Sequence, residues 1–255
     1  MSIKGISLLL LLVSLLTFPF KKQEREITEE GVFPPFVLIQ LFTSQGCSSC
    51  PPADSLLSEV AEQYESDKVF VLSYHVDYWD RLCWKDPFSQ KAFTEKQQDY
   101  AGYFHSRNIY TPQVVVNGQD EFVGSNRSEM RAQINKYKSV KAPASLSIES
   151  KSRDHNQWMV EYELDGMSEK ELFVKMAVVA NERTTQVKRG ENSNRTLTNT
   201  HVVLQEIRQK ISDSKGSITI GLIDGLLNHK NLKVIAYVQG ESGPILAADQ
   251  ITWTE

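Results

Sequence analysis

The strongest constraint on the fold of this chain is a pair of cysteines at the start of a predicted helix. An apolar run rich in β-forming residues, Phe36 to Phe42, is typical of a buried strand. After a short loop comes Cys47-Ser-Ser-Cys50, followed by Pro51 and Pro52. Proline is tolerated in the first turn of a helix, because the backbone N–H groups there have no intrahelical partner. Since residues three apart share one helical face, the sequence predicts that the two sulfur atoms can bond.

Alternating strands and helices are predicted to follow this segment. The predicted strands cover residues 69–76, 113–116 and 121–124, and the predicted helices cover residues 89–104 and 128–137, with Ser128 as the N-cap of the last one. Asn117-Gly118 is a hairpin turn signal between the last two strands. This alternation is typical of an α/β layered domain around a central sheet. We assign it to residues 35–142.

The pattern changes at residue 143, after which the chain is rich in β-segments. The predicted strands cover residues 146–149, 157–164, 172–180, 218–223, 232–238 and 245–253. Several strands separated by turn residues indicate a β-rich, sandwich-like second domain over residues 143–255. Between the third and fourth strands lies a polar loop that either is solvated, recognises a partner or bridges the two domains. Its polar residues are Asn181, Arg183, Glu191, Asn192, Arg195 and Thr198.

The first 22 residues have the layout of a secretory signal. Lys4 precedes an apolar run over residues 6–20, and Lys21-Lys22 follows it, which is the pattern of a basic n-region and an apolar h-region. The run is shorter than the roughly 20 apolar residues of a full membrane span. We therefore predict a signal peptide or N-terminal anchor over residues 1–22 and a linker over residues 23–34. The protein is expected to be exported, periplasmic or extracytoplasmic, either free or anchored in the membrane.

The cysteine pair also has a predicted chemistry. The first turn of a helix presents backbone N–H groups and the positive end of the helix dipole, which favour a thiolate. Cys47 is therefore the predicted nucleophile, and Cys50 is the thiol that resolves the mixed disulfide. The third cysteine, Cys83, lies in an aromatic, irregular segment over residues 77–88. We expect it to be a buried, inert thiol; a third redox thiol and a metal ligand are the alternatives.

Five segments of the chain form a combined motif. They are Phe42-Thr-Ser-Gln-Gly-Cys-Ser-Ser-Cys-Pro-Pro-Ala-Asp54, His75-Val-Asp-Tyr-Trp-Asp80, Trp84-Lys-Asp-Pro-Phe88, Tyr110-Thr-Pro-Gln-Val-Val-Val-Asn-Gly118 and Gly190-Glu-Asn-Ser-Asn-Arg-Thr-Leu-Thr198. Together they resemble the DUF1223 family, a thioredoxin-like family without an established activity. The resemblance covers nearly everything after the linker. It implies a thioredoxin-like domain for the first half of the chain.

The thioredoxin resemblance implies roles for further residues. The Thr111–Pro112 bond is expected to be cis, with Pro112 beside the cysteines and Thr111 among the groups that bind an extended peptide. Leu41 departs from the pattern, because thioredoxins often place a buried acid six positions before the first cysteine. His75 is the substitute that we expect to transfer protons, since its pKa is near neutral, and Asp77 is a second candidate. The alternative is that His75 is a structural histidine held by hydrogen bonds.

Tyr78 and Trp79, in the aromatic segment, either form a substrate-binding wall or pack an irregular insertion. The other polar residues of this segment, Asp80, Lys85 and Asp86, are expected to be solvated or paired with one another.

These observations favour a thiol–disulfide oxidoreductase that acts on protein or small thiol substrates with a redox partner and without a cofactor. One alternative is a soft-metal protein that binds copper or zinc through Cys47, Cys50 and His75. Another is a binding module in which the disulfide is structural. The formal net charge of −4, with no long basic stretch, argues against nucleic acid as a partner.

Overall fold

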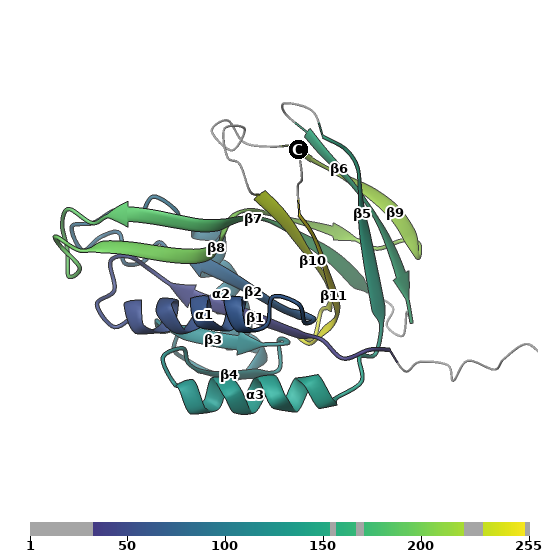
Figure 1. The fold of residues 1–255 in the computed structure, drawn as a ribbon, viewed down its shortest axis with the longest axis horizontal. Helices are drawn as coiled ribbons and strands as arrows, with labels where there is room; N and C mark the ends of the chain where they lie inside the picture. The colour runs from purple at the N-terminus through teal and green to yellow at the C-terminus, as the bar shows by residue number, and fades with distance from the viewer. Residues whose placement is uncertain (1–32, 154–156, 167–170, 222–231, 253–255) are drawn as a thin grey trace, which may run out of the picture. The chain divides into compact units, whose positions relative to one another are not determined.

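The computed structural model describes residues 33–153, 157–166, 171–221 and 232–252. It is a β-rich mixed α/β fold in which an eight-stranded sheet has the order β11-β10-β7-β8-β2-β1-β3-β4 (Figure 1). A second sheet has three strands in the order β5-β6-β9. The predicted signal segment, and the linker up to residue 32, lie outside the described residues.

The first half of the chain has the elements that the sequence predicts. They are β1 (Val37–Thr43), α1 (Pro51–Gln63), β2 (Val69–His75), α2 (Lys91–Tyr103), β3 (Gln113–Val116), β4 (Asp120–Val123) and α3 (Arg127–Ser139). Strand β1 pairs with β2 in parallel and with β3 antiparallel. The predicted cap of α3 is wrong by two residues: Asn126, not Ser128, accepts the N–H of Glu129. The Ser128 hydroxyl donates to the Asn126 side chain instead.

The second half is entirely β-structure in its described part, as predicted. The strands are β5 (Ser145–Arg153), β6 (Gln157–Asp165), β7 (Leu172–Gln186), β8 (Thr196–Lys210), β9 (Lys215–Gly221), β10 (Leu232–Gly240) and β11 (Ile245–Thr252). The polar loop predicted around residues 181–198 is wrong in extent. Half of it belongs to β7 and to β8, a strand that the sequence did not reveal, and residues 187–195 form the loop.

The two halves of the chain meet within one sheet. Strand β8 lies parallel to β2, with Ser73 opposite Val202, so β7, β8, β10 and β11 extend the sheet formed by β1 to β4. Gly31–Glu255 form one compact unit. Strands from both sides of the predicted domain boundary, between residues 142 and 143, therefore pair within one sheet. The assignment of two domains, 35–142 and 143–255, stays a prediction.

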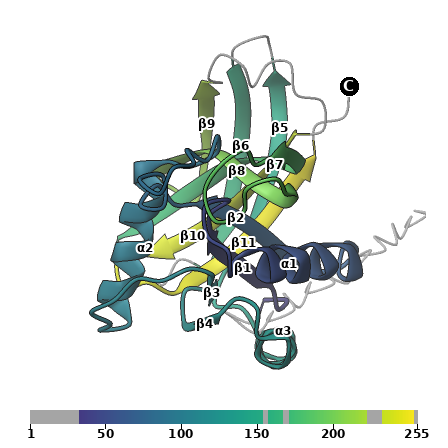
Figure 2. The ribbon, with the colours of Figure 1, turned by 90° about the vertical axis from the view of Figure 1, so that its left-hand side faces the viewer.

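Helices cover both faces of the sheet near β1 (Figure 2). On one face, Leu41 and its neighbours pack under α1 and α3. On the other face, Phe42 and Tyr74 pack with Phe93 and Tyr100 of α2. Because successive side chains of a strand point to opposite faces, this arrangement confirms that Leu41 and Gln40 face opposite ways.

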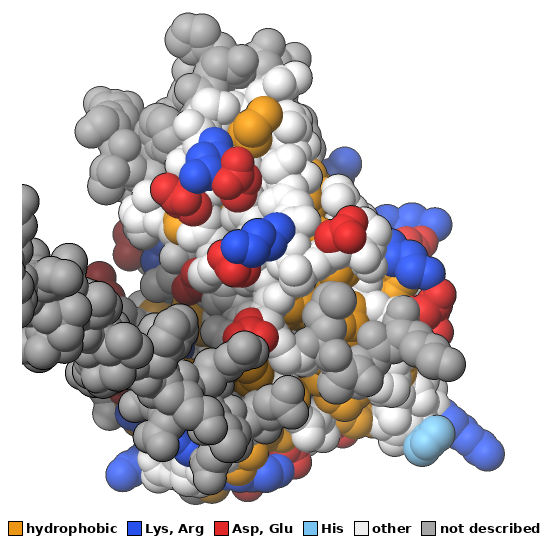
Figure 3. Space-filling model, turned by 90° about the vertical axis from the view of Figure 1, so that its right-hand side faces the viewer, with side chains coloured by type: hydrophobic (Ala, Val, Ile, Leu, Met, Phe, Trp, Pro, Cys, Tyr) orange, Lys and Arg blue, Asp and Glu red, His pale blue; other side chains and the backbone are white. Residues whose placement is uncertain are grey.

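The three-stranded sheet packs over the part of the large sheet formed by β7, β10 and β11, around buried Trp158. Its strand β6 alternates buried and exposed residues along its whole length, which is typical of a sheet with one solvated face. On the solvated side Lys151 pairs with Glu149, and Lys215 pairs with Glu163. Figure 3 views this side of the molecule, where acidic and basic side chains are interspersed. Within the described residues, no helix is long and apolar enough to span a membrane.

Candidate functional site

Cys47 and Cys50 form a disulfide at the start of α1. Their Cα atoms are 5.5 Å apart, within the ordinary range for a disulfide. Cys50 is the N-cap residue, and Pro51 and Pro52 occupy the first two helical positions, as predicted. Both cysteines have a relative exposure of 0%, although the two serines between them are exposed. The pair is thus in the position that the sequence predicts, and it is oxidised and fully covered.

The Thr111–Pro112 segment lies beside the start of α1. The bond between these two residues is cis, which confirms the prediction. The indole of Trp79 donates to the Thr111 hydroxyl at 2.7 Å, and Trp79 also contacts the backbone near Gly46. Of the predicted substrate-binding residues, Thr111 and Trp79 are therefore joined to each other next to the cysteine loop.

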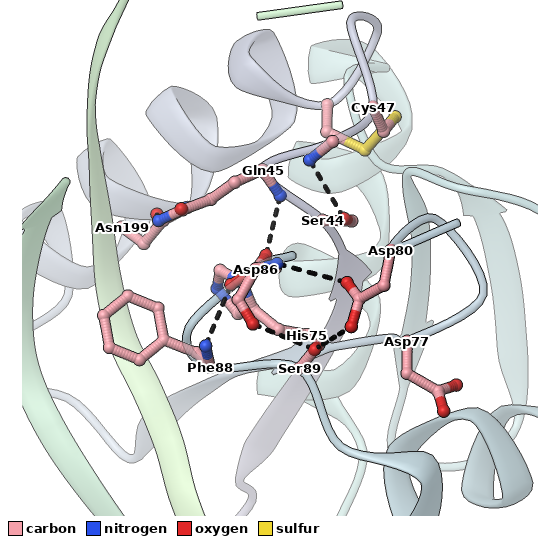
Figure 4. Close-up of polar contacts among 12 residues, drawn as sticks. Ser44, Gln45, Cys47, His75, Asp77, Asp80, Asp86, Phe88, Ser89 and Asn199 are labelled. Atoms are coloured by element: carbon pink, nitrogen blue, oxygen red, sulfur yellow. Dashed lines mark hydrogen bonds and ion pairs between the residues drawn. A yellow bond between two sulfur atoms is a disulfide. The ribbon is translucent and has the colours of Figure 1, made fainter. Parts of the chain in front are cut away.

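A buried histidine–aspartate pair lies behind this loop. His75 Nδ1 is 2.7 Å from Asp86 Oδ2, and both side chains have a relative exposure of 0%. The same carboxylate oxygen accepts the backbone N–H of Gln45 at 2.8 Å, two residues before Cys47 (Figure 4). Asp86 Oδ1 accepts the N–H of Phe88. The expected pairing within this segment is seen between the Asp86 N–H and Asp80 Oδ1 at 3.2 Å. The Asp86 carboxylate, by contrast, is neither solvated nor paired with Asp80 or Lys85, because it is buried and holds His75 and the cysteine loop.

The pair is electrostatically matched. Burial opposes the charged imidazolium, but the Asp86 carboxylate and its hydrogen bond outweigh it and raise the pKa of His75 above its usual value. Burial likewise opposes the charged carboxylate, yet His75 and the backbone N–H donors hold the pKa of Asp86 below its usual value. His75 is thus favoured as a protonated, buried side chain that keeps Asp86 ionised.

A second buried acid, Asp54, was not singled out by the sequence analysis. It lies one helical turn after Cys50, and its N–H donates to the Cys50 carbonyl at 3.1 Å. Burial raises the pKa of Asp54 to about 6, and the opposing influence of the His75 charge and of Thr43 only partly offsets this. Within the described residues, Asp54 Oδ1 and His75 Nε2 have no hydrogen-bond partner. Asp54 is thus a buried acid on the helix that Cys50 caps, four residues after that cysteine.

The tip of the β7–β8 hairpin contacts the cysteine loop from the second half of the chain. The amide of Asn192 donates to the carbonyls of Gln45 at 3.0 Å and of Cys47 at 2.9 Å. Glu191 accepts the N–H of Ser48 at 2.9 Å. Of the three readings of this polar segment, these contacts support the one in which it bridges the two halves.

The remaining predicted residues lie less close to this chemistry. Asp77 accepts a hydrogen bond from Thr94 of α2, and its side chain points towards that helix in Figure 4. Tyr78 packs beside the core that α2 covers. Cys83, expected to be buried, is instead an exposed free thiol, in a left-handed backbone conformation with φ of 71°. In the described ranges, no three His, Cys, Asp or Glu side chains are grouped so that they could hold a metal ion.

Comparison with known proteins agrees with the resemblance in the motifs. The sequence matches the family described as "Protein of unknown function (DUF1223)" over residues 38–239. The chain belongs to the DUF1223 family. This DUF1223 fold is similar to the crystal structure of a protein from Agrobacterium tumefaciens, with a TM-score of 0.65 and 25% identity, over 84% of this chain and 93% of that one.

A DUF3823 family protein from Bacteroides ovatus is a weaker match to this DUF1223 chain. Its TM-score is 0.29 and its identity 13%, over 44% of this chain and 56% of that one, too low to support an inference. No curated protein matches the sequence.

Proposed function

We propose that this DUF1223 protein is an exported thiol–disulfide oxidoreductase that uses Cys47 and Cys50. The observation that carries the proposal is the Cys47–Cys50 disulfide at the first turn of α1, with a buried acid one turn further along the same helix. The strand order β2-β1-β3-β4, with α1 and α3 on one face and α2 on the other, supports a thioredoxin-like assignment of residues 35–142. Residues 143–255 are then the β-rich part that completes the sheet.

In the reducing direction, the Cys47 thiolate attacks one sulfur of a substrate disulfide. A mixed disulfide forms and the other substrate sulfur leaves as a thiolate. Cys50 loses its proton, attacks the Cys47 sulfur and releases the second substrate thiol, so two electrons pass to the substrate and the Cys47–Cys50 disulfide is formed. Asp54 is the group that we assign to accept the Cys50 proton, because its pKa of about 6 lies close to neutrality. His75 and Asp86 position the cysteine loop through Gln45.

Export is part of the proposal, and the apolar run over residues 6–20 with flanking lysines supports it. Disulfides persist in oxidising compartments, which agrees with the oxidised pair. The partners are then exported proteins or small thiols and a redox protein that restores the active state. N-terminal sequencing of the mature protein tests whether residues 1–22 are removed.

Trapping the mixed disulfide tests the catalytic proposal. In Cys50→Ser the resolving thiol is absent, so we expect Cys47 to accumulate as a mixed disulfide with substrate proteins or with insulin. Cys47→Ser, which keeps Cys50, should form none when the exposed thiol of Cys83 is removed by Cys83→Ala in both variants. Mass spectrometry after acid quenching measures both. Absence of mixed disulfides from Cys50→Ser, in folded protein that keeps a free Cys47 thiol, would overturn the proposal.

The burial of both cysteines favours a second candidate, a binding module with a structural disulfide. The reduction potential of the Cys47–Cys50 pair separates the two. Structural disulfides typically have potentials below about −300 mV, whereas redox proteins lie between roughly −270 and −120 mV. We expect equilibration with a glutathione or dithiothreitol buffer to place this pair in the second range.

A further inference from the structure

The disulfide is covered although it lies next to exposed chain. Cys47 and Cys50 have a relative exposure of 0%, while Ser48 and Ser49 between them are exposed. Thiol exchange requires a sulfur atom to be approached by an attacking sulfur. Part of the cover must therefore move before any reaction takes place at this pair.

The β7–β8 tip, defined as residues 187–195, is attached to this loop by side chains only. Asn192 is fully buried and donates both of its hydrogen bonds to backbone carbonyls, at Gln45 and Cys47. The side-chain oxygen of Asn192, Oδ1, accepts a hydrogen bond from the Arg195 guanidinium at 2.8 Å, which fixes the orientation of the amide. Glu191 accepts the N–H of Ser48. Asn192 and Glu191 thus satisfy three backbone groups on either side of Cys47.

The strands behind this tip form an arm at the edge of the molecule. In β7, residues up to Ala180 are flanked by both β8 and β10. From Glu182 to Gln186, the pairing given for the described residues is with β8 alone. In Figure 1 the arm extends past the other strands towards the end of the molecule where α1 begins. Among the described residues, the outer side of the arm carries no further strand there, whereas buried Val187, Leu197 and Asn199 show that its other side is packed, so opening the tip also breaks some of that packing.

We propose that the β7–β8 tip is a movable cover over the Cys47–Cys50 disulfide, held closed by Asn192 and Glu191. The groups that it occupies, two carbonyls and one N–H, are backbone groups of turns that another hydrogen-bonding partner can occupy once the tip has left. A protein substrate therefore opens the site by replacing the tip on the same backbone groups. Opening of the cover by a substrate rests on the proposed function. Protection of the disulfide by the tip does not, and it is tested without a catalytic assay.

The test measures how fast dithiothreitol reduces the disulfide in the folded protein. Cys83 is exposed, so it is first blocked by alkylation. In the reaction two dithiothreitol thiols are oxidised to a cyclic disulfide while Cys47–Cys50 becomes two thiols, which are then alkylated and counted by mass spectrometry. Asn192→Ala removes two hydrogen bonds of the cover, so we expect reduction at least about tenfold faster than in the wild type.

Ser193→Ala is the matched control, because this exposed residue bonds only within the tip, to the Lys188 carbonyl. It should be reduced at the wild-type rate. Equal rates for Asn192→Ala and the wild type, or an equal acceleration in the control, would contradict the proposal. If Asn192→Ala does not fold, Glu191→Ala replaces it, since Glu191 is exposed and alanine has no side-chain acceptor for the Ser48 N–H. Faster reduction together with faster hydrogen exchange at the Ser48 N–H supports the cover, and an unchanged rate of reduction overturns it. A disulfide that opens faster but forms no mixed disulfide with substrates leaves the cover standing and removes the proposed catalysis.

Discussion

Lys96→Met should destabilise the protein by about 3–5 kcal/mol, because it leaves a buried carboxylate without its partner. Lys96 Nζ is 2.7 Å from Glu206 Oε1, and the two side chains have relative exposures of 8% and 15%. Lys96 also donates to the Tyr237 hydroxyl at 2.6 Å. Tyr237 and Tyr74 both donate to Glu206 Oε2. Glu206 is thus held by two neutral donors as well as by Lys96, and Lys96 is held by a neutral acceptor as well as by Glu206.

This cluster joins the two halves of the chain. Lys96 lies on α2 and Tyr74 on β2, whereas Glu206 and Tyr237 lie on β8 and β10. Burial opposes the charged form of Glu206, but Lys96 and Lys175 outweigh it and lower the pKa of this carboxyl. Without Lys96, part of that compensation is lost and α2 loses one of its polar contacts with the second half, while the contact between Tyr100 and Gln239 remains.

Urea unfolding at pH 7 measures the effect, with Lys91→Met as the control. Lys91 is also a lysine of α2, and it pairs with Glu95 at the surface, where the two side chains have relative exposures of 81% and 57%. Exposed pairs contribute little, so the control should unfold close to the wild type. The double variant Lys96→Met/Glu206→Gln should regain part of the loss, because the buried carboxylate that has lost Lys96 is then neutral. Equal stability of Lys96→Met and Lys91→Met would show that the cluster is not structurally important.

The sequence predicted the first half of the fold well and the second half less completely. Strands β1, β2 and β3 are apolar runs bounded by turn residues, so their type and order were visible. Strand β8 was missed because its outer part, from Thr196 to His201, is largely polar and has no apolar run. Its pairing with β7 and its contact with β2 are set by distant segments of the chain.

The same limit applies to the site. Cys47, Cys50 and Pro112 were predicted from a local motif and from a resemblance. Asp54 was not, although it follows Cys50 by four residues. A carboxyl on a helix is usually solvated, and this one is buried only because α1 packs against the sheet near Asn199, which lies 145 residues further along the chain. Asn192 was named as polar, but its contact with Cys47 spans 145 residues, and no local pattern reveals such a contact.

Asp54→Asn should stabilise the protein by up to about 3 kcal/mol above pH 7 and change it little near pH 4. The pKa of Asp54 is raised from its usual 3.8 to about 6, with burial as the main cause. The folded state therefore holds this proton more tightly than the unfolded state does. The stability that the proton confers is fully present below pH 3.8, and it is lost as the pH rises to about 6. The difference between the two pKa values corresponds to about 3 kcal/mol.

Urea unfolding of the wild type and of Asp54→Asn at pH 4 and pH 7.5 measures this difference. Other carboxyls contribute equally to both proteins, so the gap between the two should widen with pH. Glu62→Gln is the control, because Glu62 is an exposed carboxyl on the same helix, and it should show no such widening. A gap that is the same at both pH values would mean that the pKa of Asp54 is the same in the folded and unfolded states.

The same variant connects stability to the proposed chemistry. An acid that is ionised at neutral pH inside the protein lowers stability, and such a cost is expected where a function needs the group. If Asp54 accepts the Cys50 proton, Asp54→Asn should be more stable at pH 7.5 and yet resolve a mixed disulfide on Cys47 more slowly. The slowing should diminish at alkaline pH, where hydroxide and free thiolate make the acceptor unnecessary. A gain in stability with unchanged resolution at every pH would instead assign Asp54 to the fold alone.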